Sequence, residues 1–108
     1  MDVVIERYDI YLAPFDPTMG AEMGKTRPCV VLSPNEMHRT VRTVIVAPLT
    51  STRKKFPFRV NCTFQGRDGQ IALDQVRAFD RLRFIRKLGK LDEITIRRVQ
   101  LTLMALFR

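Results

Sequence analysis

Apolar and polar residues alternate most regularly between Phe58 and Phe64. A period of two is typical of a strand that buries one face, so this segment is predicted to be a half-buried β-strand. Its apolar side holds Phe58, Val60, Cys62 and Phe64. Residues 65–69 contain two glycines and predict a turn, after which residues 70–78 are expected to return as a second strand.

Three apolar runs earlier in the chain also predict strands, each bounded by proline or turn residues. The first covers residues 10–13 and is expected to end at Pro14. The second covers residues 29–32 and is expected to begin after Pro28. The third, residues 43–51, contains a continuous apolar stretch and is predicted to be buried on both faces.

Two other segments have weaker patterns. Residues 36–42 are predicted to form a polar connector, in which His38 is expected to be a solvated loop histidine with no catalytic role. Residues 81–88 fit either a short helical turn or a last strand. The pattern does not choose between these two alternatives.

The C-terminal segment has helical periodicity. Asp92 is predicted to be the N-cap of a helix that runs from Glu93 to about Phe107, with an acidic first turn that suits the helix dipole. The apolar positions cover more than one face, which is more than a helix on a single core requires. We therefore expect part of this helix to pack on a second subunit.

Taken together, five or more short strands and one C-terminal helix predict a mainly β fold, a small and mostly antiparallel barrel that occupies residues 1–108 as a single domain. Hydrophobic residues make up 45% of the chain, which is enough for a folded core.

The chain is strongly basic, with 19 Lys and Arg against 11 Asp and Glu and a net charge of +8. This excess favours a polyanionic partner, such as nucleic acid, an anionic membrane surface or an acidic polypeptide, although charge can also serve solubility alone. No apolar run is long enough to span a membrane, and the acidic N-terminus does not resemble a secretory signal. We expect a cytoplasmic protein with two reduced, packed cysteines, Cys29 and Cys62. One histidine and two distant cysteines do not make a zinc site.

Charged and hydroxyl side chains lie at the ends of two predicted strands. The loop before Pro28 carries Glu22, Lys25 and Arg27, and the strand at residues 43–51 ends in hydroxyl residues that include Thr50. If these strand ends meet, Arg27 and Thr50 face one another and can bind a phosphate between them. Considered without any other information, Arg27 is equally a surface cation and Thr50 a turn residue.

Six short motifs occur in order along the chain. They are Arg7-Tyr8-Asp9-Ile10, Asp16-Pro17-Thr18, Gly20-x-Glu22-x-Gly24-x-Thr26-Arg27-Pro28, Val46-Ala47-Pro48-Leu49-Thr50-Ser51, Asp74-Gln75-Val76-Arg77 and Leu88-Gly89-x-Leu91. Together they resemble the MazF/PemK family of toxin endoribonucleases over residues 7–107. The resemblance implies an SH3-like barrel of the CcdB/MazF/PemK type, a homodimer, cleavage of single-stranded RNA without metal or cofactor, and neutralisation by an acidic antitoxin.

The resemblance also assigns residues. Arg27 matches the family's catalytic arginine, Thr50 its catalytic threonine, and Glu22 a loop glutamate that activity often needs. Some PemK-like members use a histidine and a second arginine where this chain has Ala21 and Ala72, so that acid–base scheme is not open to it. We expect Arg27 to stabilise charge, Thr50 to position the phosphate, and Glu22 to act as base or as loop anchor.

Further residues are candidates for contact with RNA because they are basic, aromatic or polar at strand ends. They are Ser51, Lys25, Arg53, Lys54, Lys55, Phe56, Asp74 and Gln75, with Phe15 as a second stacking candidate. Each aromatic residue is also a plausible core residue. Asp74 and Gln75 can instead satisfy backbone groups.

Two rival functions belong to the same fold. A CcdB-like gyrase poison would bind and not cleave, but that group uses a C-terminal Trp-Gly-Ile and this chain has no tryptophan. A catalytically idle RNA-binding module is the other alternative. Whether mRNA, rRNA or tRNA is the target does not follow from the sequence.

Overall fold

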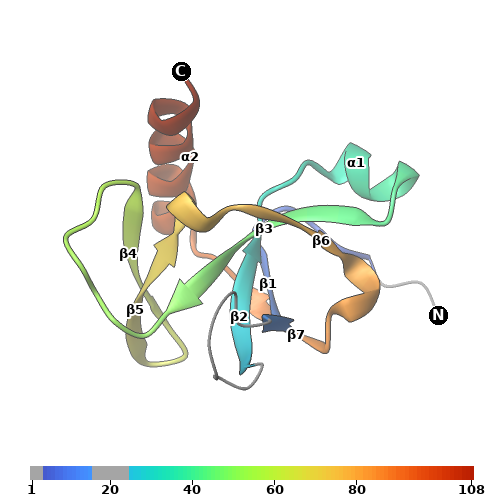
Figure 1. The fold of residues 1–108 in the computed structure, drawn as a ribbon, viewed down its shortest axis with the longest axis horizontal. Coiled ribbons are helices and arrows are strands. Elements are labelled where there is room, and N and C mark those ends of the chain that lie inside the picture. Colours follow the sequence, from blue (N-terminus) through green and yellow to red (C-terminus); the bar gives the residue numbers. More distant parts are fainter. Residues whose placement is uncertain (1–3, 16–24) are drawn as a thin grey trace.

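The computed structural model describes residues 4–15 and 25–108. Strands dominate, and the one long helix is C-terminal (Figure 1). The elements are β1 (Asp9–Phe15), β2 (Lys25–Val31), α1 (Asn35–Thr40), β3 (Thr43–Thr50), β4 (Arg59–Phe64), β5 (Arg67–Ala72), the 3-10 helix η1 (Leu73–Gln75), β6 (Arg77–Asp80), the 3-10 helix η2 (Arg81–Arg83), β7 (Arg86–Lys90) and α2 (Glu93–Phe107). The expected mainly β fold with a C-terminal helix is confirmed.

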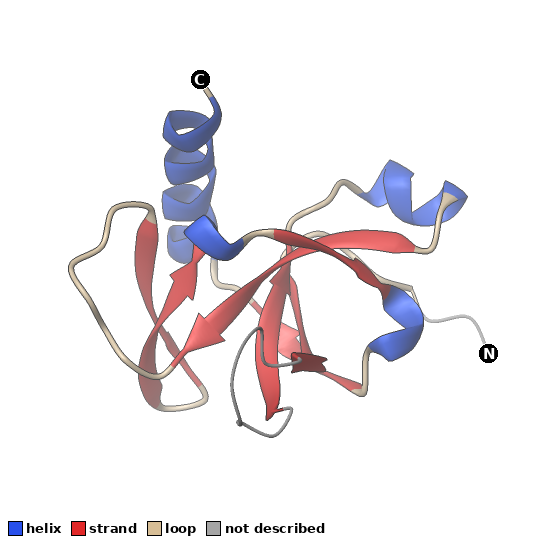
Figure 2. Cartoon of the chain, viewed as in Figure 1, coloured by secondary structure: helices blue, strands red, loops and turns tan. Residues whose placement is uncertain are grey.

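All strand pairs are antiparallel, in the order β4-β5-β3-β2-β1-β7, with β6 paired to β3 off this path. Strand β3 links two parts of the sheet. Its first residues pair with β2 and β6, whereas Leu49 and Thr50 pair with β5. The sheet therefore curls, and Figure 2 shows β3 crossing from one part to the other, with α1 and α2 on opposite sides.

The central strands are buried on both faces, as predicted for residues 43–51. Alternate residues of β1, β2 and β3 enter two separate apolar clusters. The first cluster includes Ile10, Val30 and Ala47 and is covered by α2 through Val99. The second cluster includes Tyr11, Ala13, Cys29, Val31, Val44, Val46 and Phe79.

Helix α2 begins as predicted. The Asp92 carboxylate accepts a hydrogen bond from the Thr95 backbone N–H at 3.1 Å, which satisfies one unpaired donor of the first turn. Val99 is fully buried, but Leu101, Met104 and Phe107 are exposed. The wide apolar surface is thus present, and its packing on a second subunit stays a prediction.

Two strand boundaries differ from those predicted. β1 continues through Pro14, and β2 begins at Lys25 and contains Pro28. Proline is tolerated in a strand where its missing N–H is not needed. The pairing of β2 with β3 ends at Cys29, so Pro28 lies where β2 has β1 as its only paired neighbour among the described residues.

The predictions for three further segments are corrected, and the two alternatives left open for a fourth segment are both found. The predicted polar connector contains the helix α1, and the strand predicted at residues 70–78 is broken by η1. Residues 81–88 contain both alternatives, the helical turn η2 and the start of β7. The predicted five-residue turn is only two residues long, because Gln65 and Gly66 both adopt positive φ (53° and 75°), as a tight hairpin turn requires.

Candidate active site at the ends of strands β2 and β3

The register of two neighbouring strands relates Arg27 to Thr50. The last pair that β2 and β3 form is Cys29 with Pro48, and continuing this register for two residues beyond the paired region would set Arg27 opposite Thr50. Residues two apart on a strand point to the same face, so the two side chains share the face of Cys29 and Pro48. At this point β3 leaves β2 and pairs with β5, as the arrowhead of β3 in Figure 1 shows. Arg27 and Thr50 therefore flank the position at which the two strands separate.

The two side chains differ in their hydrogen bonding. Arg27 is partly buried and makes no hydrogen bond or ion pair with any residue in 4–15 or 25–108. The Thr50 hydroxyl donates to the backbone oxygen of Thr52 at 3.0 Å. A planar guanidinium with unused donors matches two oxygens of a phosphate, and a strand-end hydroxyl can add a third hydrogen bond.

Aromatic rings and arginines form a cluster on the same face of the sheet. Phe15 and Phe79 stack with ring centroids 5.6 Å apart. The Arg77 guanidinium lies 5.6 Å from the first ring and 5.7 Å from the second, and that of Arg83 lies 4.7 Å from the Phe79 ring. The sequence did not predict this cluster, because its members come from β1, β6 and η2. Phe15 alone was a stacking candidate.

The acidic residue of the predicted RNA-binding set is already paired. Asp74 accepts two hydrogen bonds from the guanidinium of Arg59, at 2.6 and 3.1 Å. This pairing lowers the pKa of the Asp74 carboxyl below its usual value. Asp74 thus fixes an arginine of β4 in place, while its neighbour Gln75 is exposed.

The basic loop between β3 and β4 separates into inward and outward side chains. Arg53 points inward and donates to the backbone oxygens of Gly69 and Cys62, both at 3.1 Å. Phe56 is half exposed, with the Lys54 ammonium 5.4 Å from its ring and the Arg59 guanidinium 5.0 Å from it. Among the predicted RNA-binding residues, Lys25, Ser51 and Lys55 are also exposed. Glu22, the predicted base or loop anchor, lies outside the described residues.

The prediction for His38 is wrong. The ring is buried, with Nε2 2.7 Å from Ser33 Oγ and Nδ1 2.9 Å from the Ile5 backbone oxygen. It is a structural histidine whose polar atoms are satisfied by residues distant in sequence, so its polar neighbours in the chain gave no signal of burial.

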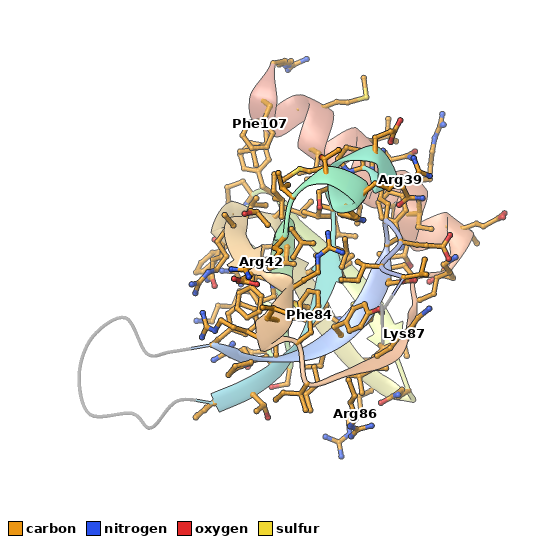
Figure 3. All side chains as sticks on the ribbon, turned by 90° about the vertical axis from the view of Figure 1, so that its right-hand side faces the viewer. Arg39, Arg42, Phe84, Arg86, Lys87 and Phe107 are labelled. Carbon is orange, nitrogen blue, oxygen red and sulfur yellow. The ribbon has the colours of Figure 1, made fainter. Side chains whose placement is uncertain are left out.

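The described residues contain a cavity of about 880 Å³, lined by residues of the N-terminal segment, β1, α1, η2, β7 and the segment between η2 and β7. Phe84, Arg86 and Lys87 belong to its lining and are labelled in Figure 3. None of the predicted site residues in the described part of the chain lines it, so its size does not mark the predicted chemistry.

The two cysteines are buried and unbridged, as expected. Burial raises the pKa of the Cys29 thiol to about 12, so this side chain behaves as a small apolar residue. Within residues 4–15 and 25–108, no three His, Cys, Asp or Glu side chains gather as a metal site would require. In the same part of the chain, every helix is too short or too polar to cross a bilayer.

Comparison with known proteins places this geometry in a family. The model of the PemK-like, MazF-like toxin of type II toxin–antitoxin systems matches residues 6–107. The endoribonuclease EndoA of Bacillus subtilis is 32% identical over 97 residues, covering 84% of each chain. The endoribonuclease toxin MazF of Escherichia coli is 39% identical over 70 residues, covering 65% of this chain and 63% of its own.

Solved structures agree. The crystal structure of MazF from Deinococcus radiodurans superimposes with a TM-score of 0.80 at 29% identity, over 97% of both chains. A structure titled MazE-MazF from the same organism matches with a TM-score of 0.80 at 29% identity, over 97% of this chain and 96% of that one. The expected barrel type is thereby confirmed, and the chain belongs to the PemK-like, MazF-like family of toxins from type II toxin–antitoxin systems.

Proposed function

We propose that this protein is the toxin of a toxin–antitoxin pair and acts as a sequence-specific endoribonuclease that needs no metal. Its relatives from Bacillus subtilis and Escherichia coli are named as endoribonucleases. The observation that supports the proposal is the β2–β3 register, which, continued two residues past the Cys29–Pro48 pair, would set Arg27 opposite Thr50. Cleavage of messenger or other single-stranded RNA would stop translation and growth.

The proposed reaction uses the RNA as its own nucleophile. The 2′-oxygen attacks the adjacent phosphorus and loses its proton, so a 2′,3′-cyclic phosphate forms. The bond between phosphorus and the 5′-oxygen breaks, and that oxygen takes up a proton as the 5′-hydroxyl of the downstream fragment. Negative charge on the phosphate oxygens is greatest between these two events, and its stabilisation is the main task of the protein.

Arg27 carries that task in this proposal. Its guanidinium donates to two phosphate oxygens, neutralises the developing charge and delivers a proton toward the leaving 5′-oxygen. Thr50 donates its hydroxyl to the same phosphate and thereby fixes the orientation of the scissile linkage. The exchange of its present partner, the Thr52 oxygen, for a phosphate oxygen requires only rotation of the hydroxyl.

Glu22 is the proposed acceptor of the 2′-hydroxyl proton. A carboxylate suits this role when it lies within hydrogen-bond reach of the hydroxyl and its pKa is raised toward neutrality by closure over the substrate. Arginine is a poor base because its guanidinium is already protonated when the substrate binds, whereas that proton can still pass to the more basic leaving 5′-oxygen. The proposal thus separates charge stabilisation, by Arg27, from proton acceptance, by Glu22.

The proposed partners follow from charge and from the relatives. A net charge of +8 favours RNA and an acidic antitoxin for the same surface. The structure titled MazE-MazF supports a protein partner, and a toxin homodimer is the proposed assembly. The exposed apolar residues of α2, which include Leu101 and Met104, are the surface that we assign to the second subunit.

The test is cleavage of a long single-stranded RNA in EDTA, with the cut sites mapped by sequencing and the ends analysed by mass spectrometry. We expect cuts within one short sequence, each leaving a 2′,3′-cyclic phosphate and a 5′-hydroxyl. An Arg27→Ala preparation controls for contaminating ribonuclease, and Arg86→Ala, at the exposed start of β7, is the matched arginine control. Intact RNA with the wild-type protein, or cleavage only after metal is restored, would contradict the proposal.

A further inference from the structure

Gln70 is a buried polar side chain that lies beside Thr50. It stands directly opposite Thr50 in the pairing of β3 with β5, and only 4% of it is exposed. Its amide nitrogen donates to the Lys54 backbone oxygen at 2.7 Å and to Asn61 Oδ1 at 3.0 Å. Its amide oxygen accepts from the Lys54 backbone N–H at 3.1 Å. One side chain thus holds both backbone polar groups of Lys54.

The residue before Lys54 strengthens this attachment. Arg53 donates to the backbone oxygens of Gly69 and Cys62, so the loop is held against β4 and β5 at two consecutive residues. A β-carbon at Gly69 would clash with the Thr50 backbone oxygen, which shows how closely β5 approaches the end of β3. Both strands and the loop therefore form one rigid corner.

This corner determines where the Thr50 hydroxyl points. The hydroxyl donates to the Thr52 oxygen, and that oxygen lies between Thr50, fixed by its pairing with β5, and Lys54, fixed by Gln70. Only three residues lie between Thr50 and Lys54, so the Thr52 carbonyl has little freedom. Loss of the attachment at Lys54 would release the Thr52 carbonyl and, with it, the orientation of the hydroxyl.

We propose that Gln70 is a positioning residue, which anchors the segment from Ser51 to Lys54 and so holds the Thr50 side chain in the rotamer from which its hydroxyl hydrogen can turn from the Thr52 oxygen to the scissile phosphate. Gln70 itself touches no substrate. The inference rests on the proposed ribonuclease activity and adds a residue that the sequence motifs do not contain. Glutamine is suited to the role because its amide nitrogen donates to one backbone group while its amide oxygen accepts from the other.

The decisive variant is Gln70→Glu, which keeps the size of the side chain but replaces the amide donor by a second acceptor. The carboxylate would face the Lys54 and Asn61 oxygens, both acceptors, and would release the loop. We expect kcat on a short RNA to fall roughly 10- to 100-fold with little change in KM, because a misplaced group costs rate more than affinity. Gln65→Glu, in the exposed turn between β4 and β5, introduces the same charge and should leave both constants unchanged.

A double-variant cycle separates positioning from a general loss of stability. If Gln70 acts through Thr50, Gln70→Glu combined with Thr50→Val should be no slower than Thr50→Val alone. Effects that multiply, or a Gln70→Glu enzyme with wild-type kcat, would overturn the inference while leaving the ribonuclease proposal intact. A wild-type protein that does not cleave RNA would remove both.

Asn61→Ala provides a second route if Gln70→Glu does not fold, which circular dichroism would reveal. It removes only the bond from the Gln70 amide to Asn61 Oδ1, and Asn61 is exposed. A smaller fall in kcat, of about threefold, is expected, again absent in the Thr50→Val background. Unchanged kcat in this variant, with Gln70→Glu unfolded, would count against the inference.

Discussion

The Arg59 side chain on β4 donates two hydrogen bonds to the Asp74 carboxylate, whereas the Arg27 side chain on β2 bonds to none of the described residues. Neither residue is fully exposed, so the difference is not one of exposure alone. Arg59 and Arg53 each donate two hydrogen bonds, to a carboxylate and to backbone oxygens respectively. The Arg53 and Arg59 guanidinium groups therefore stabilise the β4–β5 hairpin, whereas the Arg27 guanidinium remains available for a ligand.

The comparison teaches that a count of basic residues overstates the RNA-binding surface. The net charge of +8 includes arginines whose donors are committed to internal partners. A guanidinium that already satisfies its donors inside the protein would have to break these bonds to hold a phosphate. The predictions below change one side of this contrast at a time.

The largest effect is expected from the unpaired arginine. Arg27→Ala should lower kcat by at least about 10²–10³, because it removes preorganised donors from the developing charge. Its unfolding in urea should stay close to wild type. Arg59→Ala should do the opposite, with kcat within about threefold and a loss of about 1 kcal/mol in the free energy of unfolding. The contrast fails if both variants lose the same fraction of activity.

Thr50→Val tests the hydroxyl and keeps the branched shape of the side chain. A hydrogen bond to a charged phosphate is worth about 1.5–3 kcal/mol, so kcat should fall roughly 10- to 100-fold. Thr50→Ser retains the hydroxyl and should recover most of the rate. Equal activity in the valine and serine variants would mean that the hydroxyl does not touch the reacting phosphate.

The Arg59–Asp74 pair predicts a dependence of stability on pH. The arginine lowers the pKa of the folded Asp74 carboxyl below that of the unfolded chain, so the pair stabilises the protein above the unfolded pKa of about 4. This contribution should be lost as the pH falls through the lowered value. Because Asp74 is 38% exposed, we expect at most about 1 kcal/mol at pH 7 between wild type and Asp74→Asn. Urea unfolding at a series of pH values should show this difference shrinking in acid; a constant difference would contradict it.

The smallest effect is expected from an outward cation of the β3–β4 loop. Lys55→Ala should weaken RNA binding about threefold, equally for cleaved and uncleaved sequences, and reduce the slope of log affinity against log salt by about 0.7. Lys90→Ala, at the end of β7, is the matched control and should bind as the wild type does. Binding titrations at several salt concentrations measure both quantities.

Local patterns were enough to predict some elements. The alternation around Val60 and Cys62 predicted β4, and Asp92 followed by a long periodic segment predicted α2. Helix α1 was missed because six residues carry less than two turns of pattern. The break in the strand predicted at residues 70–78 was missed as well. The 3-10 helix η1 depends on backbone dihedral angles, which the hydrophobic pattern does not reveal.

The site was predictable in part. The family motifs supplied Arg27 and Thr50 as candidates, and the β2–β3 register then gave a spatial reason to consider them together. The sequence could not show that Arg53 and Asp74 have internal partners, nor that Gln70 holds the loop. Those contacts join residues from different strands, and only the fold brings them together.

A structure of the protein bound to an RNA that carries a 2′-deoxy nucleotide at the cut site tests the central claim most directly. The account predicts the Arg27 guanidinium and the Thr50 hydroxyl within hydrogen-bond distance of the same scissile phosphate. A scissile phosphate held by other residues, with either of these two side chains turned away from it, would contradict the account.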